Sequence, residues 1–341
     1  MRLAVLNPRG RDPEQDFPDF AGAPGSRLHP PVNYHAYAAC TGGGFHRSVS
    51  SLPPGRREVL LLIRRREMAL CVKTLAELRR QGRFVAVAAK ECGLHQVAEL
   101  LGKPGNPALF GQLCSGADLC LAATPDLVPI YRAAGAKRVE FIPTPYPVDD
   151  ARWDFSIPAA ERRGVFIGTR EFGVPSRNHL AALLCARGFQ EPVTVVNSER
   201  ATGRRLLAGL GFKEGGLRVV EGYRPYPDYL RLMAAHRLVF QLDRSAVPGQ
   251  VAGDALLCGI PCAGGDSAVE RLAFPSLSGD FTRCVEAARE LLSDPGRYEK
   301  AVEESRAAAS ARLSFRSVRK QLEALSADRP PALESEGHPA A

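Results

Sequence analysis

The stretch 239–270 combines the residue types that a nucleotide-diphosphate site requires. Gly249 has no side chain, so a ligand can approach its backbone closely. The residues after it predict a helix over 250–258, whose free N–H groups and partial positive charge suit a diphosphate. Asp254 lies about one turn inside this helix, where a carboxylate could accept hydrogen bonds from both hydroxyls of a ribose. The alternative is an exposed polar residue on an amphipathic helix, although the neighbours of Asp254 are small.

Two groups of polar residues follow predicted strands in the first half of the chain. Arg64 and Arg65 follow the apolar run 59–63, and Glu91 follows the run 84–89. Ligands of parallel sheets lie beyond the carboxyl ends of the strands, so both groups could face one. The arginines could bind a phosphorylated or polyanionic acceptor; the alternative is a solvated helix start, although cations there oppose the helix dipole. Glu91 is the best carboxylate in this half for a general base.

A glycine-rich run and three histidines complete the candidates for acceptor contacts. The run Thr41-Gly42-Gly43-Gly44 could line a cleft, with Gly43 against the ligand, although glycine marks any tight turn. The histidines that could contact an acceptor or a sugar are His35, His46 and His95, and His95 is also a candidate catalytic residue. A lone histidine is more often a structural or surface residue, which is the alternative for each.

Short apolar runs alternate with helical patterns in the first half. Such alternation predicts a parallel sheet with helices on both faces. The strands are expected at 3–6, 59–63, 84–89, 119–123 and 139–142. Prolines at every second position from 143 to 147 then exclude a helix and favour an extended linker.

The same alternation resumes after the linker. Strands are expected at 164–168, 193–196, 217–220, 238–242 and 260–263. Helices are expected at 176–186, 227–235, 250–258 and 281–292, and a helical stretch from about 298 to 325 closes the fold, with a break near Leu313. The fold class predicted is therefore α/β, with two Rossmann-like, doubly wound parallel-sheet domains facing across a cleft.

The proline linker sets the domain boundaries that we expect. Residues 1–148 form the first domain, and residues 149–327 form the second, including the closing C-terminal helices. Residues 328–341 are rich in Pro, Ala and Glu and are expected to be a disordered tail.

Gly249, Asp254, Gly259 and Pro261 fall in register with a pattern found in glycosyltransferases of the GT-B fold. The chain resembles the retaining group of that family, whose pattern is a glutamate, seven residues, a second glutamate and a Gly-x-Pro strand entry. The resemblance implies that Asp254 holds the donor ribose, as aspartate in place of the second glutamate. It also implies that Gly249 and Gln250 lie near the sugar and phosphates of the donor.

The resemblance extends from about 117 to 274 and covers further residues. Gly168 ends a predicted strand at the point where the family has a glycine-rich loop and a basic residue on the diphosphate. This implies Arg170, and after it Arg177, for the diphosphate contact. His95 lies near the place where the family often has a polar group that faces the donor or the acceptor.

One position departs from the family pattern. Ala246 stands where the first glutamate is expected. Asp243, three residues earlier, could reach a similar place as a catalytic carboxylate. The stretch therefore supports nucleotide binding more firmly than a retaining mechanism, and the stereochemical outcome stays open.

Composition limits the class of protein. The 341 residues carry a formal net charge of +8, which suits nucleotide phosphates, nucleic acid or an anionic membrane surface. The nine cysteines form no C-x-x-C pair and lie mostly in apolar runs, so a reducing cytoplasm is expected. No apolar run reaches the roughly 18 residues of a spanning helix. No metal site is expected, because Asp149-Asp150 lies in the linker and looks structural.

The function expected is transfer of a sugar from a nucleotide-diphosphate donor, UDP-linked, to a hydroxyl-bearing acceptor, without metal or cofactor. Three alternatives stay open: an epimerase of the same fold that acts on a UDP-sugar, a non-catalytic nucleotide-sugar or nucleic-acid binding protein, and a transferase whose acceptor is modified DNA. A steep salt dependence of duplex binding would mark the nucleic-acid alternatives.

Overall fold

The first half of the chain forms a sheet of short apolar strands. The computed structural model describes residues 1–26, 28–168 and 172–327, and its first sheet has the order β2-β3-β1-β4-β5-β6-β7. The strands that the sequence predicts are β1 (Ala4–Leu6), β4 (Glu58–Ile63), β5 (Phe84–Ala89), β6 (Leu119–Ala122) and β7 (Val139–Phe141). Residues 59–63 of β4 are fully buried, as expected for a central parallel strand covered on both faces.

Two further strands extend this sheet at its edge. β3 (Gly44–His46) pairs in parallel with β1, and β2 (Gln15–Asp16) pairs antiparallel with β3. The chain runs from β1 outward to β3 and then returns to β4 on the other side of β1. The strand order therefore reverses at β1, between β3 and β4, which places a topological switch point at the carboxyl end of β1.

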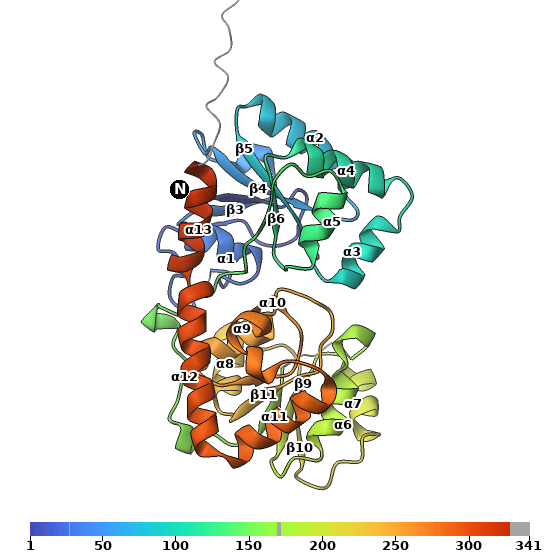
Figure 1. The fold of residues 1–341 in the computed structure, drawn as a ribbon, viewed down its shortest axis with the longest axis vertical. Helices are drawn as coiled ribbons and strands as arrows, with labels where there is room; N and C mark the ends of the chain where they lie inside the picture. The colour runs from blue at the N-terminus through green and yellow to red at the C-terminus, as the bar shows by residue number, and fades with distance from the viewer. Residues whose placement is uncertain (27, 169–171, 328–341) are drawn as a thin grey trace, which may run out of the picture.

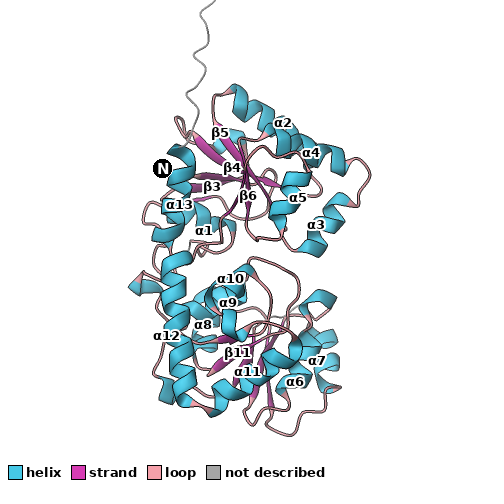
Figure 2. Cartoon of the chain, in the orientation of Figure 1, coloured by secondary structure: helices cyan, strands magenta, loops and turns pink. Residues whose placement is uncertain are grey.

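Helices cover both faces of the first sheet. Figure 2 shows α1 on one side of the strands and the group α2 to α5 on the other. The helices are α1 (Tyr34–Cys40), α2 (Met68–Arg80), α3 (Leu94–Leu101), α4 (Asn106–Gly116) and α5 (Leu127–Ala133).

The second sheet is parallel throughout and has the order β10-β9-β8-β11-β12. Its strands are β8 (Val165–Ile167), β9 (Val193–Asn197), β10 (Leu217–Glu221), β11 (Leu238–Phe240) and β12 (Cys262–Ala263). The chain runs outward from β8 to β10 and returns to β11 on the other side of β8, so the switch point lies at the carboxyl ends of β8 and β11.

The helices of the second half surround this sheet. They are α6 (His179–Ala186), α7 (Arg200–Ala208), α8 (Tyr226–Ala234), α9 (Gln250–Leu257), α10 (Ala268–Ala273), α11 (Phe281–Ser293) and α12 (Pro295–Arg312). All nine cysteines are free, and eight of them are buried. In the described ranges, no helix is long and apolar enough to cross a membrane.

The chain passes between the domains twice at one place. The linker carries it forward, and the N–H of Tyr146 donates to the carbonyl of Leu313 at 2.7 Å, where the chain returns. The helix after this return, α13 (Phe315–Ala327), buries Val318 and Leu322 in the core of the first domain. Figure 1 shows α12 beside the second domain and α13 beside the first. The sequence predicts that both helices close the second domain, whereas in the structure α13 completes the first.

Candidate functional site

Loops from the carboxyl ends of both sheets meet at one junction. Leu94 follows β5 of the first sheet, and its N–H donates to the carbonyl of Ser245, which follows β11 of the second, at 3.2 Å. The Nδ1 of His95 lies 3.5 Å from the hydroxyl of Ser176, which in turn is 2.8 Å from the hydroxyl of Ser245. The junction therefore lies at the switch point of the second sheet, where a doubly wound fold binds its ligands.

Gly249 caps the helix α9 on the side of this junction. Its φ of 102° is a conformation that a side chain would strain, and an ideal Cβ would lie 2.1 Å from the hydroxyl of Ser267. Gln250, the first residue of α9, accepts a hydrogen bond from the amide of Asn33 in the first domain at 3.2 Å. The first turn of α9 thus faces the first domain, and its role in binding a diphosphate stays a prediction.

Gly168, at the end of β8, packs against the same helix. A Cβ on Gly168 would lie 2.1 Å from a methyl carbon of Val251, so glycine is required for this close approach. The hydroxyl of Tyr229 donates to the carbonyl of Gly168 at 3.1 Å. Arg170, the first choice for the diphosphate contact, lies outside the described residues, and its role stays a prediction.

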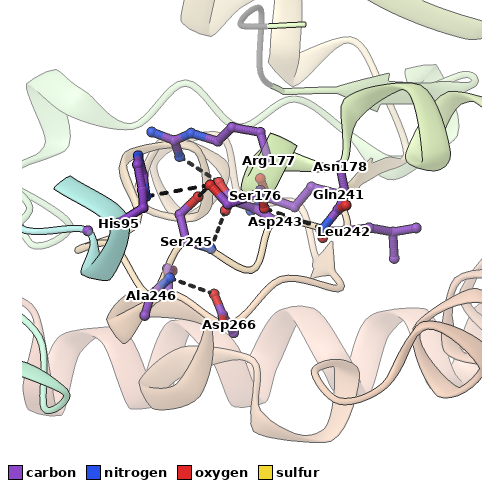
Figure 3. Close-up of polar contacts among 12 residues, drawn as sticks. His95, Ser176, Arg177, Asn178, Gln241, Leu242, Asp243, Ser245, Ala246 and Asp266 are labelled. Atoms are coloured by element: carbon purple, nitrogen blue, oxygen red, sulfur yellow. Dashed lines mark hydrogen bonds and ion pairs between the residues drawn. The ribbon is translucent and has the colours of Figure 1, made fainter. Parts of the chain in front are cut away.

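Arg177 and Asp243, two predicted site residues, form an ion pair with each other at 2.5 Å (Figure 3). Asp243 is 4% exposed and also accepts from the N–H of Ser245 at 2.7 Å. Asn178, which has a φ of 52°, donates to the carbonyl of Leu242 at 3.0 Å. The loop that contains Arg177 is therefore fastened to the loop after β11. In this arrangement Asp243 stabilises the loops, and a catalytic role would require it to leave Arg177.

Asp254 lies on the inner face of α9 and is 1% exposed. The hydroxyl of Tyr226, at the start of α8, donates a hydrogen bond to its carboxylate. Burial raises the pKa of Asp254 to about 7, against the lowering effect of the Tyr226 hydrogen bond. A ribose could therefore reach this carboxylate only by displacing Tyr226, a contact between two helices that no local sequence pattern indicates.

Ala246, where the family pattern has a glutamate, takes a left-handed conformation with a φ of 48°. Its N–H donates to the carboxylate of Asp266 at 3.0 Å, as Figure 3 shows. Burial raises the pKa of Asp266, while the hydrogen bond from Ala246 and the charge of Arg271 lower it. The loop thus holds an acidic group beside the position of the missing glutamate.

Glu270 is fully buried behind this loop. Its carboxylate accepts from the N–H of Ser267 at 2.7 Å and from the amide of Gln241. Burial raises the pKa of Glu270 to about 7, and these hydrogen bonds oppose the rise. Ser267 and Glu270 form a capping box at the start of α10, so this glutamate has a structural role.

On the first domain, His95 and Glu91 lie where the sequence predicts. His95 is the second residue of α3 and faces Ser176 of the second domain. Glu91 is exposed just beyond the carboxyl end of β5. Both are therefore at the correct edge of the sheet for an acceptor site, and their catalytic roles stay predictions.

The two arginines after β4 are engaged within the first domain. Arg64 donates to the carbonyls of Pro8 and Arg9, at 3.1 and 2.8 Å, and so fastens the loop after β1. Arg65 pairs with Glu99 of α3 at 2.5 Å. The anion that compensates Arg65 is thus a carboxylate of the protein. Binding of a phosphorylated or polyanionic acceptor by Arg64 and Arg65 stays a prediction.

The prediction that Gly43 lines the cleft is wrong. Residues 44–46 form β3, so Gly43 lies at the amino end of a strand, whereas the junction is formed by carboxyl-end loops. A Cβ on Gly43 would lie 2.0 Å from the carbonyl oxygen of Leu3, so close strand packing explains the glycine. His46 ends β3 at the carboxyl side and is 6% exposed, and burial lowers its pKa. His35 stacks on Phe45 and is also buried.

Within the residues that the structure describes, no three His, Cys, Asp or Glu side chains group as a metal site would require. The residues at the junction that sequence reasoning missed contact the predicted ones from other elements. They are Asn33, Ser176, Asn178, Tyr226, Ser245 and Asp266. Asp266 directly follows the glycine pair after β12. This position just beyond the end of a strand is the sequence feature that indicates a residue near the ligand site.

No family model and no curated protein sequence matches the chain. Solved structures do match it. HepE of Anabaena in complex with UDP and glucose is 16% identical with a TM-score of 0.61, over 79% of this chain and 78% of that one. The sucrose-phosphate synthase of Thermosynechococcus elongatus is 15% identical with a TM-score of 0.61, over 95% of this chain and 98% of that one.

A UDP-forming α,α-trehalose-phosphate synthase of Burkholderia xenovorans is 12% identical with a TM-score of 0.60, over 87% of this chain and 80% of that one. At identities this low the likeness shows the fold alone. Two sheets with switch points at facing loops, joined by a double crossing, agree with that likeness. This chain therefore has the GT-B fold, with two Rossmann-like domains facing across a cleft.

Proposed function

We propose that this protein is a glycosyltransferase that moves a sugar from a nucleotide-diphosphate sugar, UDP-linked, to a hydroxyl-bearing acceptor. The observation that carries the proposal is the first turn of α9, which is capped by Gly249 and turned toward the first domain. Free N–H groups at a helix start favour a diphosphate, and the acceptor would approach from the opposite domain. The structures of HepE with UDP and glucose support a UDP-sugar as the donor.

The chemistry proposed needs no metal or cofactor. When the bond between sugar and diphosphate breaks, negative charge develops on the leaving diphosphate. The N–H groups of α9 and the cations Arg170 and Arg177 would stabilise that charge. Arg177 is paired with Asp243. It would therefore either move toward the diphosphate or stabilise its charge while it stays paired with Asp243. We place His95 and Glu91 on the acceptor side, as candidates for the group that receives the proton of the acceptor hydroxyl.

A nucleotide panel tests the proposal. The full-length protein is mixed with UDP-, GDP- and ADP-glucose, and thermal shift and donor hydrolysis are followed. We expect stabilisation and slow hydrolysis with the UDP-sugar. If no nucleotide shifts the melting temperature and none is turned over, the proposal fails. Conversion of the UDP-sugar to an epimer without any acceptor would replace the transferase by an epimerase.

A further inference from the structure

Four carboxylates lie within 239–270, and they differ sharply in accessibility. Asp243, Asp254 and Glu270 are 4%, 1% and 0% exposed, and each accepts a hydrogen bond from a neighbouring group of the protein. The side chain of Asp266 is 22% exposed. Among these four, Asp266 is therefore the carboxylate that a ligand at the junction could reach without rearranging the core.

The position of Asp266 is fixed by the loop that leads into α9. Its Oδ1 accepts from the N–H of Ala246 at 3.0 Å, and Ala246 lies four residues before the first residue of α9. A backbone N–H is a more rigid partner than a flexible side chain, because it belongs to a planar peptide of the loop. The carboxylate is thus held beside the helix start that would bind a diphosphate.

A cation links Asp266 to the other side of the cleft. Arg271 lies 4.0 Å from Asp266 and 2.7 Å from Asp126 of the first domain, which follows β6. The guanidinium of Arg271 therefore sits between an acid of each domain. Asp266 consequently lies close to the first domain, on the side from which an acceptor would approach.

We propose that Asp266 accepts hydrogen bonds from hydroxyls of the donor sugar and so determines which sugar is bound. This inference rests on the proposed function. An ionised carboxylate accepts at both oxygens, so it can bind two neighbouring hydroxyls of one ring. A sugar on a diphosphate at the start of α9 would begin next to the loop that holds Asp266. The contact adds sugar recognition to a site otherwise built for the nucleotide.

The test separates the sugar from the nucleotide. Dissociation constants for UDP and for UDP-glucose, UDP-galactose and UDP-N-acetylglucosamine are measured by calorimetry on wild type, Asp266→Asn and Asp266→Ala. We expect the affinity for the preferred UDP-sugar to fall about 10-fold in Asp266→Asn and about 10- to 100-fold in Asp266→Ala. The affinity for UDP should change less than about 2-fold. The dissociation constants of the three UDP-sugars should become more similar to one another.

A purely structural Asp266 would give another pattern. The amide oxygen of Asp266→Asn can still accept from Ala246, so the loop should keep its shape and UDP its affinity. Glu290→Gln is the control, because it also removes one carboxylate charge from a pair with an arginine, Arg297 at 2.7 Å, but on the outer helices α11 and α12. If the ratio of UDP-sugar to UDP affinity is the same in wild type and both variants, the role of Asp266 is overturned. If wild type binds no nucleotide, the proposed function itself fails.

Discussion

The contact between Asp254 and Tyr226 places a carboxyl group in a setting where its charge is costly. Burial raises the pKa of Asp254 from 3.8 to about 7, although the Tyr226 hydroxyl favours the charged form. Unfolding returns the group to water and to its ordinary pKa. Asp254 therefore contributes stability that is fully present below about pH 4 and is lost as the pH rises through about 7.

The pH dependence of stability checks this assignment. Asp254→Asn removes the titration but keeps an oxygen that can accept from Tyr226. We expect wild type to lose of order 2 kcal/mol relative to Asp254→Asn between pH 5 and pH 8, from about 1.4 kcal/mol per pKa unit. Denaturant unfolding at both pH values measures it. Burial also raises the pKa of Glu270. Because Glu270 is present in both proteins, its contribution to the pH dependence of stability cancels in the comparison. If the difference in unfolding free energy between wild type and Asp254→Asn does not change with pH, the raised pKa of Asp254 is contradicted.

Gly249 allows a second test at the scale of one residue. Gly249→Ala adds backbone strain and a Cβ 2.1 Å from Ser267, whereas Gly222→Ala adds strain alone, since its φ is 78° with nothing within 4 Å. We expect a loss of about 1 kcal/mol for Gly222→Ala and of about 2–4 kcal/mol for Gly249→Ala. Chemical denaturation gives both values. Equal losses would show that the approach of Gly249 to Ser267 is not tight.

At the scale of elements, periodicity and turn residues predicted the long strands and helices well. The helix expected at 250–258 is α9 at Gln250–Leu257, and the strand expected at 84–89 is β5. Both have strong local signals: a glycine at each end of the helix, and a continuous apolar run for a buried strand. The strand β3 was missed, because its three residues after a glycine run resemble a turn. The helices α4 and α7, of 11 and nine residues, were also not predicted.

Some missed elements carried a readable signal and others did not. Ser267 and Glu270 have the spacing of a capping box, which predicts the start of α10. In contrast, Arg177 and Asp243 are 66 positions apart, and Asp254 and Tyr226 are 28 apart. Contacts at such separations depend on the way that loops and helices pack, which no local pattern contains. Strand ends therefore predict which loops meet at the junction, but no local pattern predicts which of their residues pair with one another.

The packing of α13 predicts how stability is distributed. Leu322 is 5% exposed in the first core, whereas Leu206 on α7 is 38% exposed. We expect Leu322→Ala to cost about 2–4 kcal/mol and Leu206→Ala less than about 1 kcal/mol. Hydrogen exchange should show that Leu322→Ala lowers the protection of β4 and β5 more than that of β8 and β9. Equal loss in both sheets would contradict the placement of α13 on the first domain.

At the scale of the whole molecule, charged contacts join the domains across the cleft. Arg271 of α10 pairs with Asp126 at 2.7 Å, and both side chains are partly exposed. A pair of this kind adds at most about 1 kcal/mol to stability. An arrangement with the domains further apart would lose this pair, so the pair favours the close approach of the domains.

A charge swap tests this control of closure. Arg271→Glu places two acids together across the cleft, so we expect a more open molecule, with a larger radius of gyration in solution scattering. Adding Asp126→Arg restores opposite charges and should restore the wild-type value. Arg231→Glu is the control, since its pair with Asp228 lies within the second domain. An unchanged radius of gyration in Arg271→Glu would show that this pair does not hold the domains together.

The return of the chain at Leu313 has a consequence for the order of synthesis. A ribosome makes residues 1–148 before the second domain, yet Val318 and Leu322, which belong to the first core, are made after the second domain. The nascent first domain therefore lacks one of its covering helices while the second domain, whose strands and helices α6 to α12 are contiguous, can already fold. The second domain can therefore complete its fold before the first domain does, although the first domain is translated earlier. The side of the first sheet that α13 later covers is the surface that a chaperone would meet.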